Sequence, residues 1–167
     1  MVKAIVLYNS RSGNTKKVAL KIAEGLEVEF RDKRNIPDLI DYDLIVVGSW
    51  VIMGRISFGG ARYLKKLHRK NIAGKEVALF FTSGAPDDIH PMTEKKVPKK
   101  IKEVMFESME KILTKKQQVT ILPERFYCMG AIRILGKEKE NIGHPTDEEL
   151  MQAKAFGEKL KKQLENE

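Results

Sequence analysis

Short, nearly unbroken apolar runs alternate along this chain with longer segments in which apolar residues recur every three or four positions. Runs of this kind predict central strands of a parallel sheet, because such strands are covered on both faces. The three strongest runs lie at 4–8, 44–48 and 77–81. Two weaker segments complete the predicted strands: 26–30, with Val28 and Phe30 on one side, and a last strand at 119–122 and 125–128, interrupted at Pro123.

The helical spacing predicts four helices between and after these strands. The second helix covers 60–70 and the third covers 99–116. The first ends near Gly25, and the residues at its helical spacing are Thr15, Val18, Ala19, Ile22, Ala23 and Leu26. The closing helix has a clear start, since Thr146 and Glu149 have the spacing of a capping box. Its predicted core face consists of Leu150, Ala153, Phe156, Gly157 and Leu160.

Five strands that alternate with four helices predict βαβ units with right-handed crossovers, and hence an α/β fold with a doubly wound, five-stranded parallel sheet in three layers. Ligands of such sheets bind beyond the carboxyl ends of the strands. The loops that follow strands one, three and four are therefore the predicted location of the chemistry. We call them the first loop (9–15), the second loop (48–56) and the third loop (82–88).

Composition favours one domain without a membrane segment. The 167 residues contain no linker-like stretch and no internal repeat, so we expect a single domain at 1–167 in the cytoplasm, with no signal peptide. A single cysteine, Cys128, supplies neither a disulfide framework nor a metal site. The net charge of +8 owes much to lysines such as Lys99 and Lys100, which either form solvated helix faces or attract acidic partners.

The first loop has the residues of a phosphate-binding turn. A strand leads into it and a helix follows, so the unpaired N–H groups at the start of that helix would point at a bound anion. Gly13 permits close approach or a positive φ, and hydroxyl and amide side chains can add hydrogen bonds. The alternative is a loop that only caps the helix. The candidate phosphate-binding residues are Ser10, Arg11, Ser12, Gly13, Asn14 and Thr15.

The second loop is unusually apolar for an exposed connection, and the third is rich in small residues. An apolar cluster here predicts either a cover for a flat apolar ligand or a surface packed on the sheet or on a second copy. The third loop offers backbone N–H groups, although many turns have such a composition. The candidate residues are Trp50, Val51, Ile52, Met53 and Gly54 in the second loop and Ser83, Gly84 and Ala85 in the third.

The signature Ser/Thr-x-Ser/Thr-Gly-Asn-Thr, present here at 10–15 between a strand and a helix, resembles that of the flavodoxin family. The resemblance implies sheet order 2-1-3-4-5 and FMN as cofactor, with its phosphate on the first loop and its ring between the second and third. By position, Gly54 corresponds to a glycine near flavin N5 whose peptide can turn. An aromatic residue often precedes that glycine, whereas this chain has Met53 there and Trp50 further back. The segments 124–130 and 143–145 resemble a subgroup of small proteins with this domain.

The resemblance implies an electron carrier between redox partners, present as a monomer or homodimer, and the lysines favour acidic docking surfaces over nucleic acid. No nucleophile–base pair is evident, so reactivity would belong to the cofactor. The alternatives are an FMN-dependent NAD(P)H or quinone reductase, a protoporphyrinogen-oxidising enzyme, or a non-redox phosphate-binding module. A phosphatase of the Cys-x5-Arg type is excluded by the Cys128–Arg133 spacing. His68, His90 and His144 are expected at the surface, although His90 could stand near the flavin.

Overall fold

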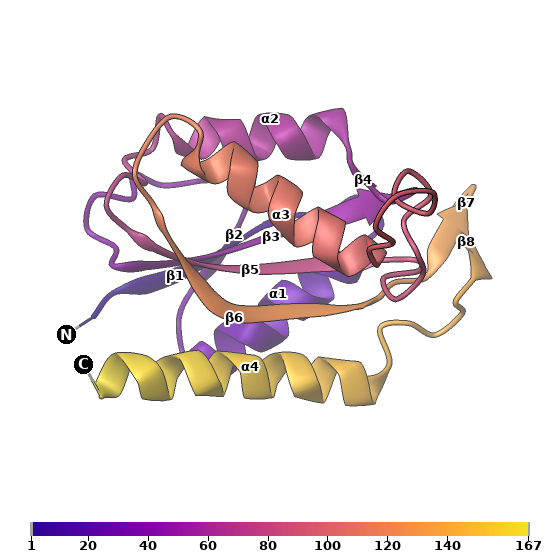
Figure 1. The fold of residues 1–167 in the computed structure, drawn as a ribbon. Helices are drawn as coiled ribbons and strands as arrows, with labels where there is room; N and C mark the ends of the chain where they lie inside the picture. Colours follow the sequence, from indigo (N-terminus) through magenta and orange to yellow (C-terminus); the bar gives the residue numbers. More distant parts are fainter. Residues whose placement is uncertain (1, 167) are drawn as a thin grey trace.

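A parallel β-sheet forms the middle layer of the structure, a computed structural model that describes residues 2–166 (Figure 1). Its main path runs β2-β1-β3-β5-β6, which is the order 2-1-3-4-5 expected for five principal strands. A short strand, β4 (Arg55–Ile56), pairs antiparallel with the end of β3. The principal strands are β1 (Ala4–Asn9), β2 (Phe30–Asp32), β3 (Leu44–Ile52), β5 (Glu76–Ser83) and β6 (Thr120–Met129).

Two helices cover each face of this sheet (Figure 1). On one face α1 (Asn14–Leu26) packs against α4 (Asp147–Glu165), and on the other α2 (Phe58–Leu67) lies beside α3 (Ile101–Thr114). The Thr146–Glu149 capping box at the start of α4 is confirmed. The doubly wound, three-layer α/β fold is therefore confirmed, with two helices and one buried core on each side of the sheet.

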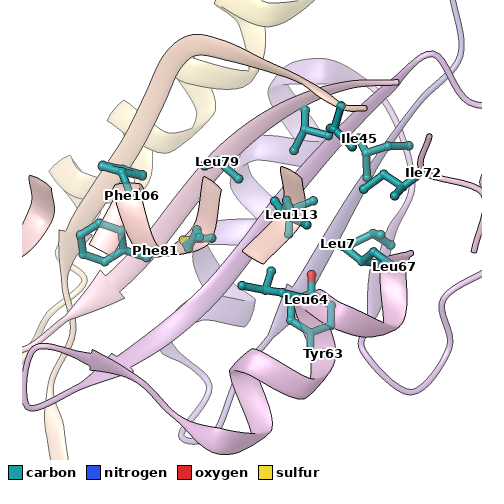
Figure 2. Close-up of a cluster of buried hydrophobic side chains, with 14 of the residues drawn as sticks. Leu7, Ile45, Tyr63, Leu64, Leu67, Ile72, Leu79, Phe81, Phe106 and Leu113 are labelled. Atoms are coloured by element: carbon teal, nitrogen blue, oxygen red, sulfur yellow. The ribbon is translucent and has the colours of Figure 1, made fainter. Parts of the chain in front are cut away.

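The two buried cores explain why the apolar runs in the central strands are unbroken. Successive strand side chains point to opposite faces, so Leu7 faces α2 and α3 while Val6 and Tyr8 face α1 and α4. Figure 2 shows the first core, where Leu7, Ile45 and Leu79 of neighbouring strands lie beside residues of the covering helices. Both faces of the central strands are buried except at their ends, so the runs in the middle of these strands are apolar.

Several predicted boundaries were wrong because pairing extended or displaced the elements. The segment 26–30 is not a strand: α1 continues to Leu26, and β2 begins at Phe30. β3 and β5 run four and two residues beyond the predicted ends at 48 and 81, because Trp50 pairs with Thr82 and Val51 with Ile56. Much of the second loop and the start of the third are therefore strand. Pro123 does not interrupt β6, since a register shift opposite Val77 and Leu79 accommodates it.

Helix boundaries also moved by a few residues. α2 begins at Phe58 rather than at 60, because the Ser57 hydroxyl accepts a hydrogen bond from Gly60 N–H and caps the helix, and it ends at Leu67. α3 is shorter at both ends than the predicted 99–116. On the expected core face of α4, Leu150 is only partly buried, whereas the other four residues are buried.

A small antiparallel hairpin that the sequence pattern did not predict follows β6. It consists of β7 (Ile132–Ile134) and β8 (Lys137–Glu140) and lies at the carboxyl end of the sheet, the end at which β4 also lies (Figure 1). Two short strands joined by 135–136 give only a weak hairpin signal.

Candidate functional site

A cleft of about 630 Å³ opens at the carboxyl ends of β1, β3 and β5. Its volume is within the range of about 300–1,000 Å³ that is usual for small-molecule sites. All three predicted loops contribute to it, and β7 and β8 add a wall. The lining residues are Arg11, Ser12, Asn14, Thr15, Trp50, Val51, Ile52, Met53, Gly54, Thr82, Ser83, Gly84, Ala85, Pro91, Ile101, Gly130, Ala131, Ile132, Arg133 and Glu140.

The first loop presents the start of α1 to this cleft. Gly13 is the N-cap residue, has a φ of 96°, and provides no side-chain cap. The first N–H groups of a helix have no intrahelical acceptor, so those of Asn14 and Thr15 remain available beside the cleft. Gly13 N–H is used differently, since it donates to the Ser10 hydroxyl at 3.1 Å. Of the predicted residues, Ser10 and Gly13 support the loop but do not line the cleft.

The Asn14 and Thr15 side chains are buried and already have partners in the protein. Asn14 Nδ2 donates to Ala131 O at 2.9 Å, and the Thr15 and Thr82 hydroxyls share a hydrogen bond of 2.7 Å. These bonds join the first loop to the segment after β6 and to β5. Backbone N–H groups, rather than these side chains, are therefore the donors that the loop offers to a ligand.

The second loop is a tight hairpin between β3 and β4. Met53 and Gly54 form its turn with φ values of 49° and 69°, the two positive values that a type I′ turn needs. Val51 is buried, Trp50 is half-buried, and Met53 is 91% exposed. The Arg11 guanidinium lies over the Trp50 ring, 5.5 Å from its centroid. This wall of the cleft is therefore a strand end with an aromatic surface, next to a projecting methionine.

The third loop is held closely by the segments that follow β6. Asn141 Nδ2 donates to Gly84 O at 2.6 Å, and Gly130 N–H donates to Ser83 O at 3.0 Å. A Cβ on Gly84 would lie 2.8 Å from Ile132 Cδ1, so the Ile132 side chain lies directly against the backbone of the third loop. Ser83, Gly84 and Ala85 thus form a small-residue wall beneath Ile132.

Three residues of the β7–β8 hairpin that sequence reasoning missed line the cleft: Ile132, Arg133 and Glu140. Arg133 donates to Ser12 O at 3.2 Å and pairs with Glu138 at 3.1 Å, which fixes its guanidinium beside the first loop. Of the described residues that line the cleft, Glu140 is the only carboxylate. The basic composition of the segment was the one available signal.

The expectation of surface histidines was wrong for His90, which is only 6% exposed. Its Nε2 lies 2.9 Å from Gly54 O, the turn of the second loop. His68 and His144 are partly buried and have partners in Ile112 O and Glu149 respectively. No pattern in the sequence distinguishes a buried histidine in a loop from an exposed one.

Cys128 is buried. Burial raises the pKa of its thiol far above the ordinary value, and the nearby Glu149 charge acts in the same direction. A thiol in this state is not a nucleophile at neutral pH. The donors of the cleft are instead backbone N–H groups and the guanidinium groups of Arg11 and Arg133, and most of its other lining side chains are small or apolar. This distribution suits a ligand with a phosphate at one end and a flat ring at the other.

Comparisons with known proteins agree with this geometry. A family model described as "Flavodoxin domain" matches residues 5–158. A flavodoxin-like domain-containing protein, BilS of Clostridioides difficile (strain CD3), is 27% identical over 188 residues, covering 95% of this chain and 96% of its own.

Solved structures with a similar fold include flavodoxins. An archaeal flavodoxin has a TM-score of 0.67 at 22% identity, covering 98% of this chain and 99% of its own. A Lactobacillus acidophilus flavoprotein in complex with FMN has a TM-score of 0.55 at 19% identity, covering 76% of this chain and 93% of its own. Within residues 2–166, no helix is long and apolar enough to cross a membrane.

Proposed function

This chain belongs to the flavodoxin domain family, and from this membership we propose that it binds FMN in the cleft and carries electrons between redox partners. One observation carries the proposal: the open N–H groups at the start of α1 face the same cleft as the aromatic wall formed by Trp50. A helix N-terminus favours a phosphate group. An apolar wall in the same cleft favours a flavin ring.

In this proposal the phosphate binds the first loop, at 10–15, where Arg11 and Arg133 add positive charge. The ring lies between the second loop, at 50–54, and the third, at 83–85. FMN is favoured over FAD because one helix N-terminus provides for one terminal phosphate. We also propose that residues 1–167 act as one domain. Bound FMN would supply the redox chemistry, while the protein binds and orients it.

The role of carrier is favoured over that of an enzyme because the cleft offers few acid–base groups. Glu140 is its only carboxylate among the described lining residues, and no base stands next to a nucleophile there. NAD(P)H or quinone turnover by the purified protein alone would contradict a pure carrier role. Reduction only through a partner protein would support the carrier role. We also propose that the protein acts in the cytoplasm.

The first test is the absorption spectrum of the purified protein. We expect a yellow protein with flavin bands, from which heat or acid releases FMN in a ratio of about one per chain. Titration of the apoprotein with FMN, riboflavin and inorganic phosphate would then rank the ligands. A colourless protein that takes up no flavin, but binds another phosphorylated compound, would contradict the proposal and favour a non-redox binding module.

We further propose that partners dock at the mouth of this cleft with an acidic surface. Exposed apolar side chains project there, with Met53 91% exposed and Leu135, at the tip of the β7–β8 hairpin, 97% exposed. A contiguous apolar patch on a surface marks a contact site, and we propose that these two side chains belong to one. The net charge of +8 would steer an acidic partner towards the protein.

Electron transfer to such a partner is expected to slow at least about tenfold as salt rises and the Debye length falls from about 10 Å to about 3 Å. The measurement is stopped-flow transfer to an acidic ferredoxin-type protein at several salt concentrations. Transfer to a small uncharged acceptor is the control and should change little. If both reactions respond equally to salt, the charge of the protein is not used for docking.

A further inference from the structure

His90 is a polar residue in the interior of a loop, and its backbone is fully engaged. Its N–H donates to Lys99 O at 2.8 Å, and its carbonyl accepts from both the N–H and the hydroxyl of Thr93. The side chain is 6% exposed. The loop between β5 and α3 therefore holds the imidazole in a fixed place, next to the turn of the second loop.

The hydrogen bonds of the ring define its tautomer. Met92 N–H lies 3.3 Å from Nδ1, and a backbone N–H can only donate, so Nδ1 accepts and carries no proton. The proton of the neutral ring is then on Nε2, which lies 2.9 Å from Gly54 O and donates to it. His90 thus links two backbone groups from different loops, one as acceptor and the other as donor.

This link determines which way the Gly54 carbonyl faces. Gly54 lines the cleft, whereas His90, which binds its carbonyl, does not. The carbonyl is therefore directed away from the cleft and into the protein. The contact is also close: a Cβ on Gly54 would lie 3.2 Å from His90 Cδ2 and 3.3 Å from Nε2. A positive φ and this proximity both favour glycine at the position.

We propose that His90 is a positioning residue that withholds the Gly54 carbonyl from the cleft and so biases which redox form of the flavin the protein binds more tightly. This inference rests on the proposed flavin site. A ring nitrogen that gains a hydrogen on reduction becomes a donor, and a released carbonyl beside it would accept from it. By holding that carbonyl, His90 lowers the preference for the reduced ring.

The variants His90→Asn and His90→Gln separate this role from a merely structural one. The amide nitrogen of Gln can occupy the place of Nε2 and keep the bond to Gly54 O, whereas Asn can accept from Met92 N–H but is too short to reach Gly54. In His90→Asn we expect the affinity for reduced FMN, relative to oxidised FMN, to rise about tenfold, as one hydrogen bond allows. The midpoint potential rises accordingly, and His90→Gln stays close to the wild type.

A measurement on the wild-type apoprotein supports this test without any variant. Nitrogen-15 NMR of the His90 ring should show a protonated Nε2 and an unprotonated Nδ1. The opposite tautomer would overturn the proposal, as would equal potentials in wild type, His90→Asn and His90→Gln. Equal shifts in the two variants would also overturn it. If the wild type bound no flavin at all, the proposed function would fail instead, and the NMR result would still report on the link to Gly54.

Discussion

Replacing Ser12 by Asp is expected to weaken FMN binding about a hundredfold and to leave riboflavin binding almost unchanged. Ser12 lines the cleft directly before the N-cap of α1, where the proposed phosphate binds. A unit negative charge about 4 Å from another costs on the order of 4 kcal/mol at an effective dielectric constant of about 20. A separation twice as large still costs about 2 kcal/mol. If the new carboxylate instead paired with Arg133, it would withdraw a cation from the phosphate and weaken binding further.

Ser12→Asn is the matched control, because asparagine has nearly the same size as aspartate but carries no charge. We expect it to bind FMN within a few-fold of the wild type. An acidic residue next to the start of a helix is favourable for the helix dipole, so Ser12→Asp should not lower the stability of the fold. Flavin fluorescence titrations with FMN and riboflavin provide the measurement. Equal losses for both flavins, or no loss for either, would place the phosphate elsewhere.

Replacing Gly25 by Ala is expected to destabilise the protein by about 3 kcal/mol, because α1 and α4 cross at backbone distance there. A Cβ on Gly25 would meet Lys154 O at 2.0 Å, and one on Gly157 would meet Ile22 O at 2.2 Å. Neither obstacle is a flexible side chain, so the helices must separate. Overpacking of this kind costs about 1–3 kcal/mol or more, which exceeds the gain of about 1 kcal/mol from the better helix propensity of alanine.

Gly59→Ala is the control for this prediction. Gly59 is also helical, in α2, but a Cβ there has no neighbour nearer than 3.9 Å. We expect its free energy of unfolding to stay the same or to rise by up to about 1 kcal/mol. Urea unfolding of Gly25→Ala, Gly157→Ala and Gly59→Ala makes the comparison. Similar midpoints for all three would show that the helix crossing can relax at little cost.

The sequence predicted the elements whose signals are local. Apolar runs at 4–8, 44–48 and 77–81 identified the central strands, since a strand buried on both faces leaves no place for polar side chains. The Thr146–Glu149 capping box identified the start of α4. Where a boundary depended on a partner strand, prediction failed. β3 continues to Ile52 because β5 and β4 pair with its last residues, and no residue within β3 indicates this.

The candidate site was likewise predicted only where its signals are local. The three loops were predicted from their position after strands, because parallel strands bring their carboxyl ends to one edge of a sheet. Arg133 and Glu140 were not identified as parts of the site, and the burial of His90 behind it was not predicted. Arg133 and His90 each contact a loop that is distant in sequence: Arg133 donates to Ser12 O, and His90 Nε2 lies 2.9 Å from Gly54 O. Their binding roles, like those of the predicted loop residues, stay predictions for the experiments above.

What the sequence determined by itself was the central strands, the last strand, the four helices and a loop suited to phosphate, since hydrophobic period, capping and glycine placement act within a few residues. The tertiary structure alone decided how the site is enclosed. The bond from Asn14 to Ala131 O and the bond from Asn141 to Gly84 O join segments that only the folded sheet brings together. Such contacts depend on spatial neighbours rather than on adjacent residues, so the hydrophobic pattern of the sequence does not predict them.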